Sequence, residues 1–186
     1  MIYKKLYSES EIKQVVGMLA DKLVQKLGSE LDNAVILPVL NGAMIFASDF
    51  IRELNKYGHH PEVLPIKVSS YEGMQSTGQV RFEYPSIEQL REKLKGKTIV
   101  ILEDIVDTGL TARQLIETLL EQVNPEQIYL VALLKKKDSQ IVELPKNEKV
   151  HYLYGIHIPK VFVIGYGLDL DGKYRNLPYI AQVIVN

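Results

Sequence analysis

Short runs of apolar residues alternate with amphipathic stretches along this chain, and this alternation limits the fold more than any other feature. Runs that are apolar at every position are typical of strands buried on both faces of a parallel sheet. Stretches with apolar residues three and four positions apart are typical of helices that cover such a sheet. Together they predict an α/β fold, a single domain with a central, mainly parallel sheet flanked by helices. We expect strands at residues 34–40, 63–68, 80–84, 98–102, 128–134, 161–166 and 179–185, and helices at residues 8–28, 44–57, 86–95 and 111–123.

Local signals refine several of these elements. Ser8 and Glu11 have the spacing of a capping box at the start of the first helix. Pro65 cannot donate a backbone hydrogen bond, so we expect the strand at residues 63–68 to lie at a sheet edge. Residues 80–84 alternate between apolar and polar side chains, which favours a strand that returns antiparallel.

The composition is that of one globular domain. The chain has 186 residues, of which 46% are hydrophobic and 24% charged, and we expect a single domain over residues 1–186. With a net charge of -1, the chain lacks the positive electrostatic field of a nucleic-acid binder. No run of residues approaches the ~18 apolar residues of a membrane span. The chain has no cysteine, which excludes disulfides and thiolate chemistry. We therefore expect a soluble, cytoplasmic protein with neither nucleic-acid nor membrane partners.

Residues 99–111 carry the strongest chemical signal. The apolar strand ends in two adjacent acids, Glu103 and Asp104, which need hydroxyl groups or a divalent cation as partners. Residues 107–111 then open a helix, where successive backbone amides and two hydroxyl groups suit a monophosphate. Carboxylates beside a phosphate cradle indicate a phosphorylated sugar. The alternative is that Asp107 or Thr108 only caps the helix and that the two acids are solvated.

Several segments resemble one enzyme family. VILEDIVDTGLT resembles the phosphoribosyl-diphosphate motif of the type I phosphoribosyltransferases, and its Glu-Asp-x-x-Asp-Thr-Gly pattern is similar to the purine-salvage branch, the hypoxanthine (hypoxanthine-guanine) phosphoribosyltransferases. PVLNGAMIFASDF is similar to the first phosphate loop of that branch, SSYEGMQSTGQV to its flexible catalytic loop, and VALLKKK and VFVIGYGLDLDGKYRNLPYI to its purine-contacting region. The similarity runs from about residue 35 to residue 180. It implies the type I phosphoribosyltransferase fold, with a small hood built from the N- and C-terminal segments.

The resemblance implies a purine-salvage transferase that depends on Mg²⁺. Such an enzyme converts hypoxanthine, guanine or both, together with 5-phosphoribosyl 1-diphosphate, to IMP or GMP and pyrophosphate. It also implies a homodimer or homotetramer. The residues do not indicate a preference among hypoxanthine, guanine and xanthine, because contacts to the 2-position of the purine are largely main-chain contacts.

On the phosphoribosyl side, the resemblance implies that Glu103 and Asp104 hold the ribose hydroxyls, directly or through magnesium. Asp107 is implied to accept the proton from nitrogen 7 of the purine. The implied 5-phosphate site consists of Asp107, Thr108, Gly109, Leu110 and Thr111.

On the pyrophosphate side, the resemblance implies binding by the backbone of Leu40, Asn41 and Gly42 around a cis peptide bond. From the residues alone, Asn-Gly is also a common turn dipeptide. Residues 69–79 are implied to form a flexible catalytic loop that closes as a lid. The lid residues Ser70 and Tyr71 and the distant Arg175 are implied to meet the diphosphate.

At the purine, the resemblance implies that Lys135 donates to the 6-oxo group and that Phe162 stacks on the ring. Val163 is implied to offer main-chain groups to the far edge of the purine. Asp169 is implied to lie at this end and to join Glu103 and Asp104 as a magnesium ligand. From the residues alone, Phe162 is more often a core side chain, and we expect the lysines at 136 and 137 to be solvated.

Two other classes of function remain as alternatives. A regulatory module that senses a sugar phosphate and binds RNA or DNA needs a basic face, which a net charge of -1 does not offer. A different phosphosugar enzyme or a phosphohydrolase could use the acid pair for a metal. That reading leaves Lys135 and Phe162 without a role.

Overall fold

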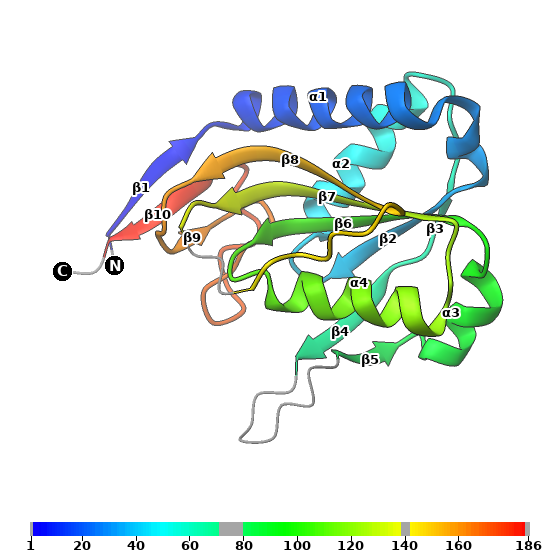
Figure 1. The fold of residues 1–186 in the computed structure, drawn as a ribbon. Coiled ribbons are helices and arrows are strands. Elements are labelled where there is room, and N and C mark those ends of the chain that lie inside the picture. The colour runs from blue at the N-terminus through cyan, green and yellow to red at the C-terminus, as the bar shows by residue number, and fades with distance from the viewer. Residues whose placement is uncertain (1, 71–79, 139–141, 185–186) are drawn as a thin grey trace.

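A seven-stranded, mainly parallel sheet forms the centre of the protein (Figure 1). The structure is a computed structural model that describes residues 2–70, 80–138 and 142–184. β5 is antiparallel to β4, and the other strand pairs of this sheet are parallel. Across the sheet the order is β5 (Val80–Tyr84), β4 (Ile66–Ser70), β2 (Val35–Leu40), β6 (Thr98–Val106), β7 (Gln127–Lys136) and β8 (Val150–Ile158), with β3 (Glu62–Val63) paired to β2.

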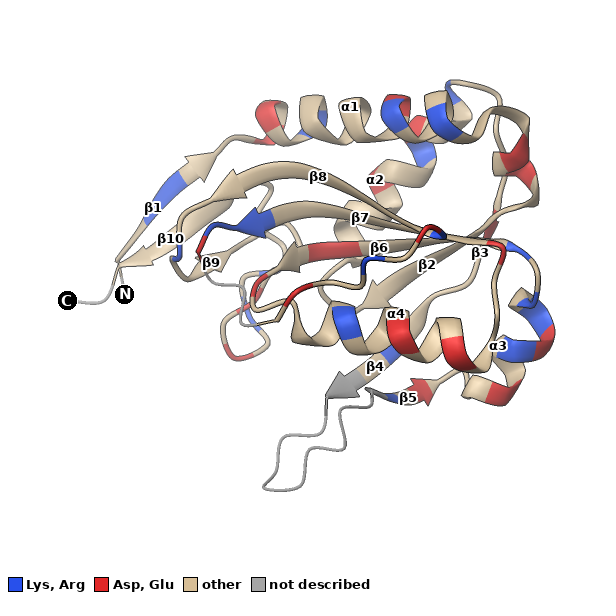
Figure 2. Ribbon diagram, viewed as in Figure 1, with Lys and Arg blue, Asp and Glu red and all other residues tan. Residues whose placement is uncertain are grey.

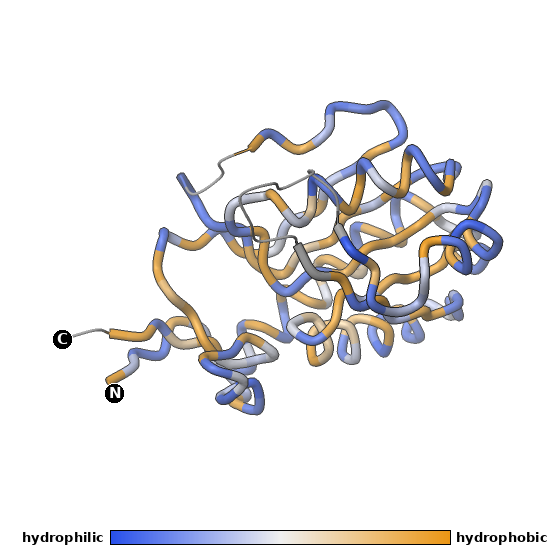
Figure 3. Tube along the Cα trace, turned by 90° about the horizontal axis from the view of Figure 1, so that it is seen from below, coloured by the Kyte–Doolittle hydropathy of each residue, from blue (hydrophilic) through white to orange (hydrophobic). Residues whose placement is uncertain are grey.

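Helices cover both faces of this sheet. α1 (Glu9–Leu27) and α2 (Met44–Asn55) lie on one face, and α3 (Ile87–Leu94) and α4 (Leu110–Gln122) lie on the other (Figure 1). Successive strand residues point to opposite layers: Leu102 of β6 packs in the cluster of α1 and α2, and Ile101 packs in the cluster of α3 and α4. This two-sided burial explains why the central strands are apolar at nearly every position, as the colouring of Figure 3 shows.

The two ends of the chain form a second, three-stranded sheet. Its order is β1 (Ile2–Tyr7), β10 (Ile180–Ile184) and β9 (Val163–Ile164), and both pairs are antiparallel. This sheet lies beyond one end of the central sheet, where both termini are found (Figure 1). It is the expected hood, and together with the central sheet it confirms the predicted fold class.

Several element predictions are confirmed. α1 begins at the predicted capping box, in which the Ser8 hydroxyl accepts from the Glu11 amide and the Glu11 carboxylate accepts from the Ser8 amide. β5 returns antiparallel to β4, as the alternation predicts. A 3-10 turn (Gly28–Asn33) follows α1. In the described parts of the chain, no helix is both long enough and apolar enough to cross a membrane.

Other element predictions are wrong. The expected strand at residues 63–68 is two strands, β3 and β4, separated by Leu64 and Pro65, and β4 lies between β5 and β2 and not at an edge. β1 and β8 are absent from the predicted elements. β8 carries tyrosines and histidines that are half-buried or exposed, and it has no continuous apolar run. β6 extends to Val106, so Glu103 and Asp104 are part of the strand.

Candidate functional site

The candidate site lies where the carboxyl ends of neighbouring parallel strands meet, which is where α/β sheets bind ligands. β2, β6 and β7 are in register, with Val35 beside Ile99 and Ile99 beside Ile128, so their ends come together at one edge. Figure 2 shows acidic residues in β6 and basic residues at the end of the neighbouring strand β7. Backbone pairing sets Val106, three residues after Glu103, beside Lys135, so residues of both charges lie toward the same edge of the sheet.

The acid pair of β6 is withdrawn from water, with Glu103 buried and Asp104 half-buried. Glu103 is 7% exposed, and burial raises its pKa well above the ordinary value, with the charge of Asp104 adding to the effect. Burial also raises the pKa of Asp104 to about 6, which the positive charge of Arg175 partly offsets and the negative charge of Asp169 reinforces. The alternative of two solvated acids is therefore wrong, and these carboxylates are suited to meet hydroxyl groups or a cation.

The loop after β2 packs directly on Asp104. A β-carbon placed on Gly42 would lie 2.0 Å from Asp104 Oδ2, so only glycine allows this approach. The peptide bond between Leu40 and Asn41 is cis, as the resemblance implies. The loop consequently presents its backbone beside the acid pair.

The turn between β6 and α4 forms a small polar cavity. Gly109, in the left-handed conformation with φ of 83°, is the N-cap of α4. The Leu110 amide donates to Thr108 Oγ1 at 3.3 Å, so the Thr108 hydroxyl accepts from the first amide of the helix. The cavity, of about 170 Å³, is lined in part by Glu103, Asp107, Thr108, Gly109 and Thr111. Its size and its helix N-terminus suit a phosphate group.

The structure corrects the expectation for Lys136. Its side chain is only 12% exposed, and its Nζ lies 2.5 Å from Asp107 Oδ2. Lys135 Nζ lies 4.2 Å from the centre of the Tyr154 ring. Adjacent strand residues point to opposite faces, so Lys136, and not Lys135, shares the face of Asp107. Lys137 is exposed, as expected.

Most of the remaining candidate residues lie around β9 and in the loop that follows it. Phe162 is 50% exposed, which contradicts the core alternative, and Val163 is buried in β9. Arg175 pairs with Asp169 at 2.8 Å and donates to the Gly167 carbonyl at 2.6 Å. Ser70 ends β4, whereas Tyr71 and residues 71–79 of the expected lid lie outside the described residues.

A magnesium site is compatible with the acid pair. Within the part of the chain that the structure describes, no three histidine or acidic side chains form a ready-made metal cluster. Magnesium is usually held by one or two carboxylates together with substrate phosphates and water. Glu103 and Asp104 supply that donor set, while the carboxylate of Asp169 is paired with Arg175.

Comparison with known proteins gives consistent matches. Residues 3–170 match the family model described as phosphoribosyl transferase domain. Hypoxanthine-guanine phosphoribosyltransferase of Dictyostelium discoideum is 36% identical over 96% of this chain and 93% of that protein. Hypoxanthine phosphoribosyltransferase of Trypanosoma cruzi, solved with the product IMP, matches with a TM-score of 0.83 and 33% identity over 96% of this chain and 92% of that one. A hypoxanthine-guanine phosphoribosyltransferase of Bacillus anthracis matches with a TM-score of 0.79 and 30% identity over 99% and 100%.

The buried charge of Glu103 predicts a stabilising substitution. The native protein holds the proton of Glu103 more tightly than the unfolded chain does, so stability falls as pH rises above the unfolded pKa of ~4.3. Glu103→Gln removes this loss. In metal-free buffer we expect a higher melting temperature at pH 8, by about 2–4 °C for each kcal/mol regained, and a smaller gain at pH 5.

Calorimetry at the two pH values measures this effect. Glu143→Gln, a change at an exposed acid, is the control and should leave the melting temperature unchanged. A lower melting temperature for Glu103→Gln at pH 8 would contradict the prediction.

Proposed function

The chain belongs to the hypoxanthine phosphoribosyltransferases, a branch of the phosphoribosyl transferase domain family, and we propose that it makes IMP and GMP from hypoxanthine and guanine. The donor is 5-phosphoribosyl 1-diphosphate, and the second product is pyrophosphate. The observation that carries this proposal is the acid pair, with Glu103 buried and Asp104 half-buried, near the cavity at the start of α4, where Lys136 is paired to Asp107. The IMP bound by the Trypanosoma cruzi relative is one of the products proposed here.

The ribose 5-phosphate is bound at the start of α4. Backbone amides of residues 108–111 and the hydroxyls of Thr108 and Thr111 contact the phosphate, with the positive end of the helix dipole behind them. Glu103 and Asp104 accept hydrogen bonds from the ribose hydroxyls, which supplies the partners that two buried acids need. Their negative potential also stabilises positive charge on the sugar ring.

The reaction is a substitution at the anomeric carbon of the ribose. A purine ring nitrogen forms a bond to this carbon while the bond from the carbon to the pyrophosphate oxygen breaks. The purine loses its ring proton to the carboxylate of Asp107, and pyrophosphate leaves with the electron pair of the broken bond. The transition state resembles an oxocarbenium ion, which the neighbouring acids favour.

We propose Lys136, in place of Lys135, as the donor to the 6-oxo group of the purine. Its ammonium lies beside Asp107, the group proposed to meet the imidazole edge of the same base. An ammonium can donate but cannot accept, so it discriminates against the 6-amino group of adenine. Phe162 offers its exposed ring for stacking, and Val163 offers main-chain groups.

Pyrophosphate is bound on the other side of the ribose. We assign this role to the backbone of Leu40, Asn41 and Gly42, to Arg175, and to Ser70 and Tyr71 of the lid. Arg175 is suited to bind the leaving group with its guanidinium. Glu103, Asp104 and Asp169 are the proposed magnesium ligands. Bound magnesium would neutralise charge on the diphosphate.

We also propose that the enzyme is a homodimer or homotetramer that acts in the cytoplasm. The absence of cysteine is compatible with a reducing compartment. Closed symmetric assemblies are the commonest oligomers of soluble enzymes.

The function is tested by pyrophosphate release from 5-phosphoribosyl 1-diphosphate with hypoxanthine, guanine, xanthine or adenine. We expect turnover with hypoxanthine and guanine, and a kcat/KM for adenine lower by about 10⁴, as for a site whose polar group is left unpaired. Excess chelator should abolish turnover. Comparable kcat/KM values for adenine and hypoxanthine, or full turnover in chelator, would overturn the proposal.

The exchange of lysine roles is tested by two matched variants. Lys136→Met removes the donor to the 6-oxo group, so the KM for hypoxanthine should rise about 10-fold or more. Lys135→Met removes an ammonium that lies over Tyr154 and should change this KM by less than about threefold. The opposite pattern in steady-state kinetics would restore Lys135 to the purine site.

The roles of the acids separate in two further variants. Asp107→Asn keeps the shape of the side chain but removes the proton acceptor, so kcat should fall by about 10² or more with the KM for 5-phosphoribosyl 1-diphosphate nearly kept. Asp104→Asn should raise that KM at least as much as it lowers kcat. Thermal unfolding checks that both variants fold. Wild-type kcat in Asp107→Asn would leave Asp107 without a catalytic role.

A further inference from the structure

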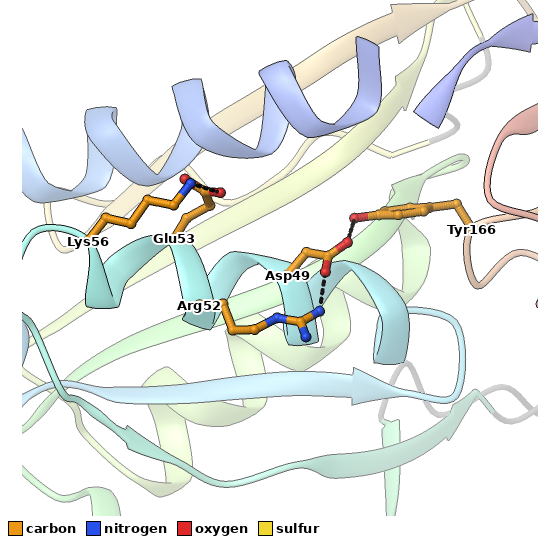
Figure 4. Close-up of polar contacts among 5 residues, drawn as sticks. All are labelled: Asp49, Arg52, Glu53, Lys56 and Tyr166. Carbon is orange, nitrogen blue, oxygen red and sulfur yellow. Dashed lines mark hydrogen bonds and ion pairs between the residues drawn. The ribbon is translucent and has the colours of Figure 1, made fainter. Parts of the chain in front are cut away.

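A hydrogen bond joins α2 to the loop that follows β9. The Tyr166 hydroxyl donates to Asp49 Oδ2 at 2.5 Å, across 117 residues of sequence. Figure 4 shows Asp49 reaching from α2 toward the Tyr166 ring, with its other oxygen accepting from Arg52. Tyr166 is 5% exposed. Neither residue is among those assigned above to substrate binding.

Tyr166 is held in an uncommon backbone conformation. Its φ of 52° lies in the left-handed region, which bulky residues rarely adopt unless the surrounding structure requires it. Its amide donates to the Leu177 carbonyl at 2.9 Å. Burial raises the pKa of Tyr166, and the hydrogen bond to Asp49 adds to the shift, so the hydroxyl stays protonated and able to donate. The surrounding structure therefore holds Tyr166 in place to donate its hydrogen bond to Asp49.

The partners of this hydrogen bond lie in α2 and in the loop after β9, and both segments connect to the proposed pyrophosphate site. α2 starts directly after residues 40–43, since the Met44 amide donates to the Asn41 carbonyl at 3.2 Å. On the other side, Gly167 follows Tyr166 and packs on the same loop: a β-carbon on Gly167 would lie 2.1 Å from the Gly42 carbonyl oxygen. Tyr166 thus lies one residue from the point where the loops touch, and Asp49 lies in the helix that follows the Gly42 loop.

The loop of Tyr166 also carries two charged residues of the site, Asp169 and Arg175. The Gly167 amide donates to the Arg175 carbonyl at 2.9 Å, and the Arg175 guanidinium donates back to the Gly167 carbonyl at 2.6 Å. Arg175 pairs with Asp169. Any shift of residues 166–167 relative to α2 therefore moves Arg175 relative to the Gly42 loop.

A cavity of about 520 Å³ adjoins the contact. Tyr166, Asp49, Ile45, Arg175 and Leu177 are among the residues that line it. Tyr166 and Leu168 of the loop pack in the core cluster that includes α2, but the cavity leaves part of this interface without side-chain contacts. The hydrogen bond then carries a larger share of the positioning than it would in a filled interior.

We propose that Tyr166 and Asp49 are positioning residues that set the pyrophosphate-binding half of the site, by fixing the Arg175 loop against the Gly42 loop. This inference rests on the proposed function. It predicts a selective defect: binding of pyrophosphate and of 5-phosphoribosyl 1-diphosphate depends on the pair, while binding of the purine does not.

Tyr166→Phe is the direct test, because it keeps the buried ring and removes only the hydroxyl. We expect the KM for 5-phosphoribosyl 1-diphosphate, and the Kd for magnesium pyrophosphate measured by calorimetry, to rise about 10-fold, as for loss of a hydrogen bond to a charged group. The KM for hypoxanthine should stay within about twofold. Asp49→Ala should reproduce this pattern. Asp49→Asn keeps an acceptor oxygen and should remain within about threefold of wild type.

Tyr152→Phe is the matched control. Its hydroxyl also donates one hydrogen bond, to the Pro145 carbonyl at 2.7 Å, on a strand that the pyrophosphate site does not use. We expect both KM values of this variant to equal those of the wild type, and thermal unfolding to show that all four variants are folded.

Two results overturn the inference. In one, Tyr166→Phe binds pyrophosphate with wild-type affinity. In the other, it loses affinity for hypoxanthine and pyrophosphate equally, which marks a general structural role. Failure of the proposed function looks different, because the wild-type protein would then release no pyrophosphate with any purine.

Discussion

The direct packing of two backbone loops is the contact on which the rest of the site depends. Gly42 lies against the Asp104 carboxylate, and Gly167 lies against the Gly42 carbonyl, in both cases with no room for a β-carbon. Through these contacts the end of β2, the acids of β6 and the Arg175 loop come within reach of one small substrate. A side chain at either glycine would separate groups that have to act together.

The acid pair shows why this site needs a ligand to complete its polar contacts. Burial raises the pKa of both carboxylates on this strand, and the charge of Asp104 raises that of Glu103 further. A sugar with vicinal hydroxyls, or a cation, satisfies them in a way that the folded chain alone does not. The site is in this sense less stable than an apolar replacement would be, which is a frequent property of binding sites.

The sequence predicted those parts of the fold whose signals are local. The two-sided burial of β6 and β7 produces apolar runs, and the Ser8 and Glu11 box marks the start of α1. The sequence did not predict β8, because its tyrosines and histidines interrupt the apolar pattern, and its place in the sheet comes from pairing with β7. Pro65 does not mark an edge, because the chain leaves one strand and begins the next around it.

The site was predicted to the level of segments, and less well to the level of side-chain direction. The sequence VALLKKK places three lysines at the end of a strand, but residues 128–134 are buried on both faces and do not indicate which face carries the ligand. In the structure the ammonium of Lys136 contacts Asp107, and this contact is the basis for proposing Lys136 as the residue that faces the purine. Asp49 and Tyr166 gave no sequence signal, since an aspartate in a helix and a tyrosine between two glycines are each unremarkable without their partner.

The pairing of β1 with β10 also orders the assembly of the site during synthesis. The segments that carry the groups proposed for phosphate and ribose, β2, β6 and α4, together with β7, have all been synthesised once residue 136 is added. β9, next to Phe162, pairs with β10, and β10 with the first strand of the chain, so this sheet has to wait for the last segment to emerge. A nascent chain therefore holds the groups proposed for the sugar phosphate well before it can form the sheet beside Phe162, on which the base is proposed to stack.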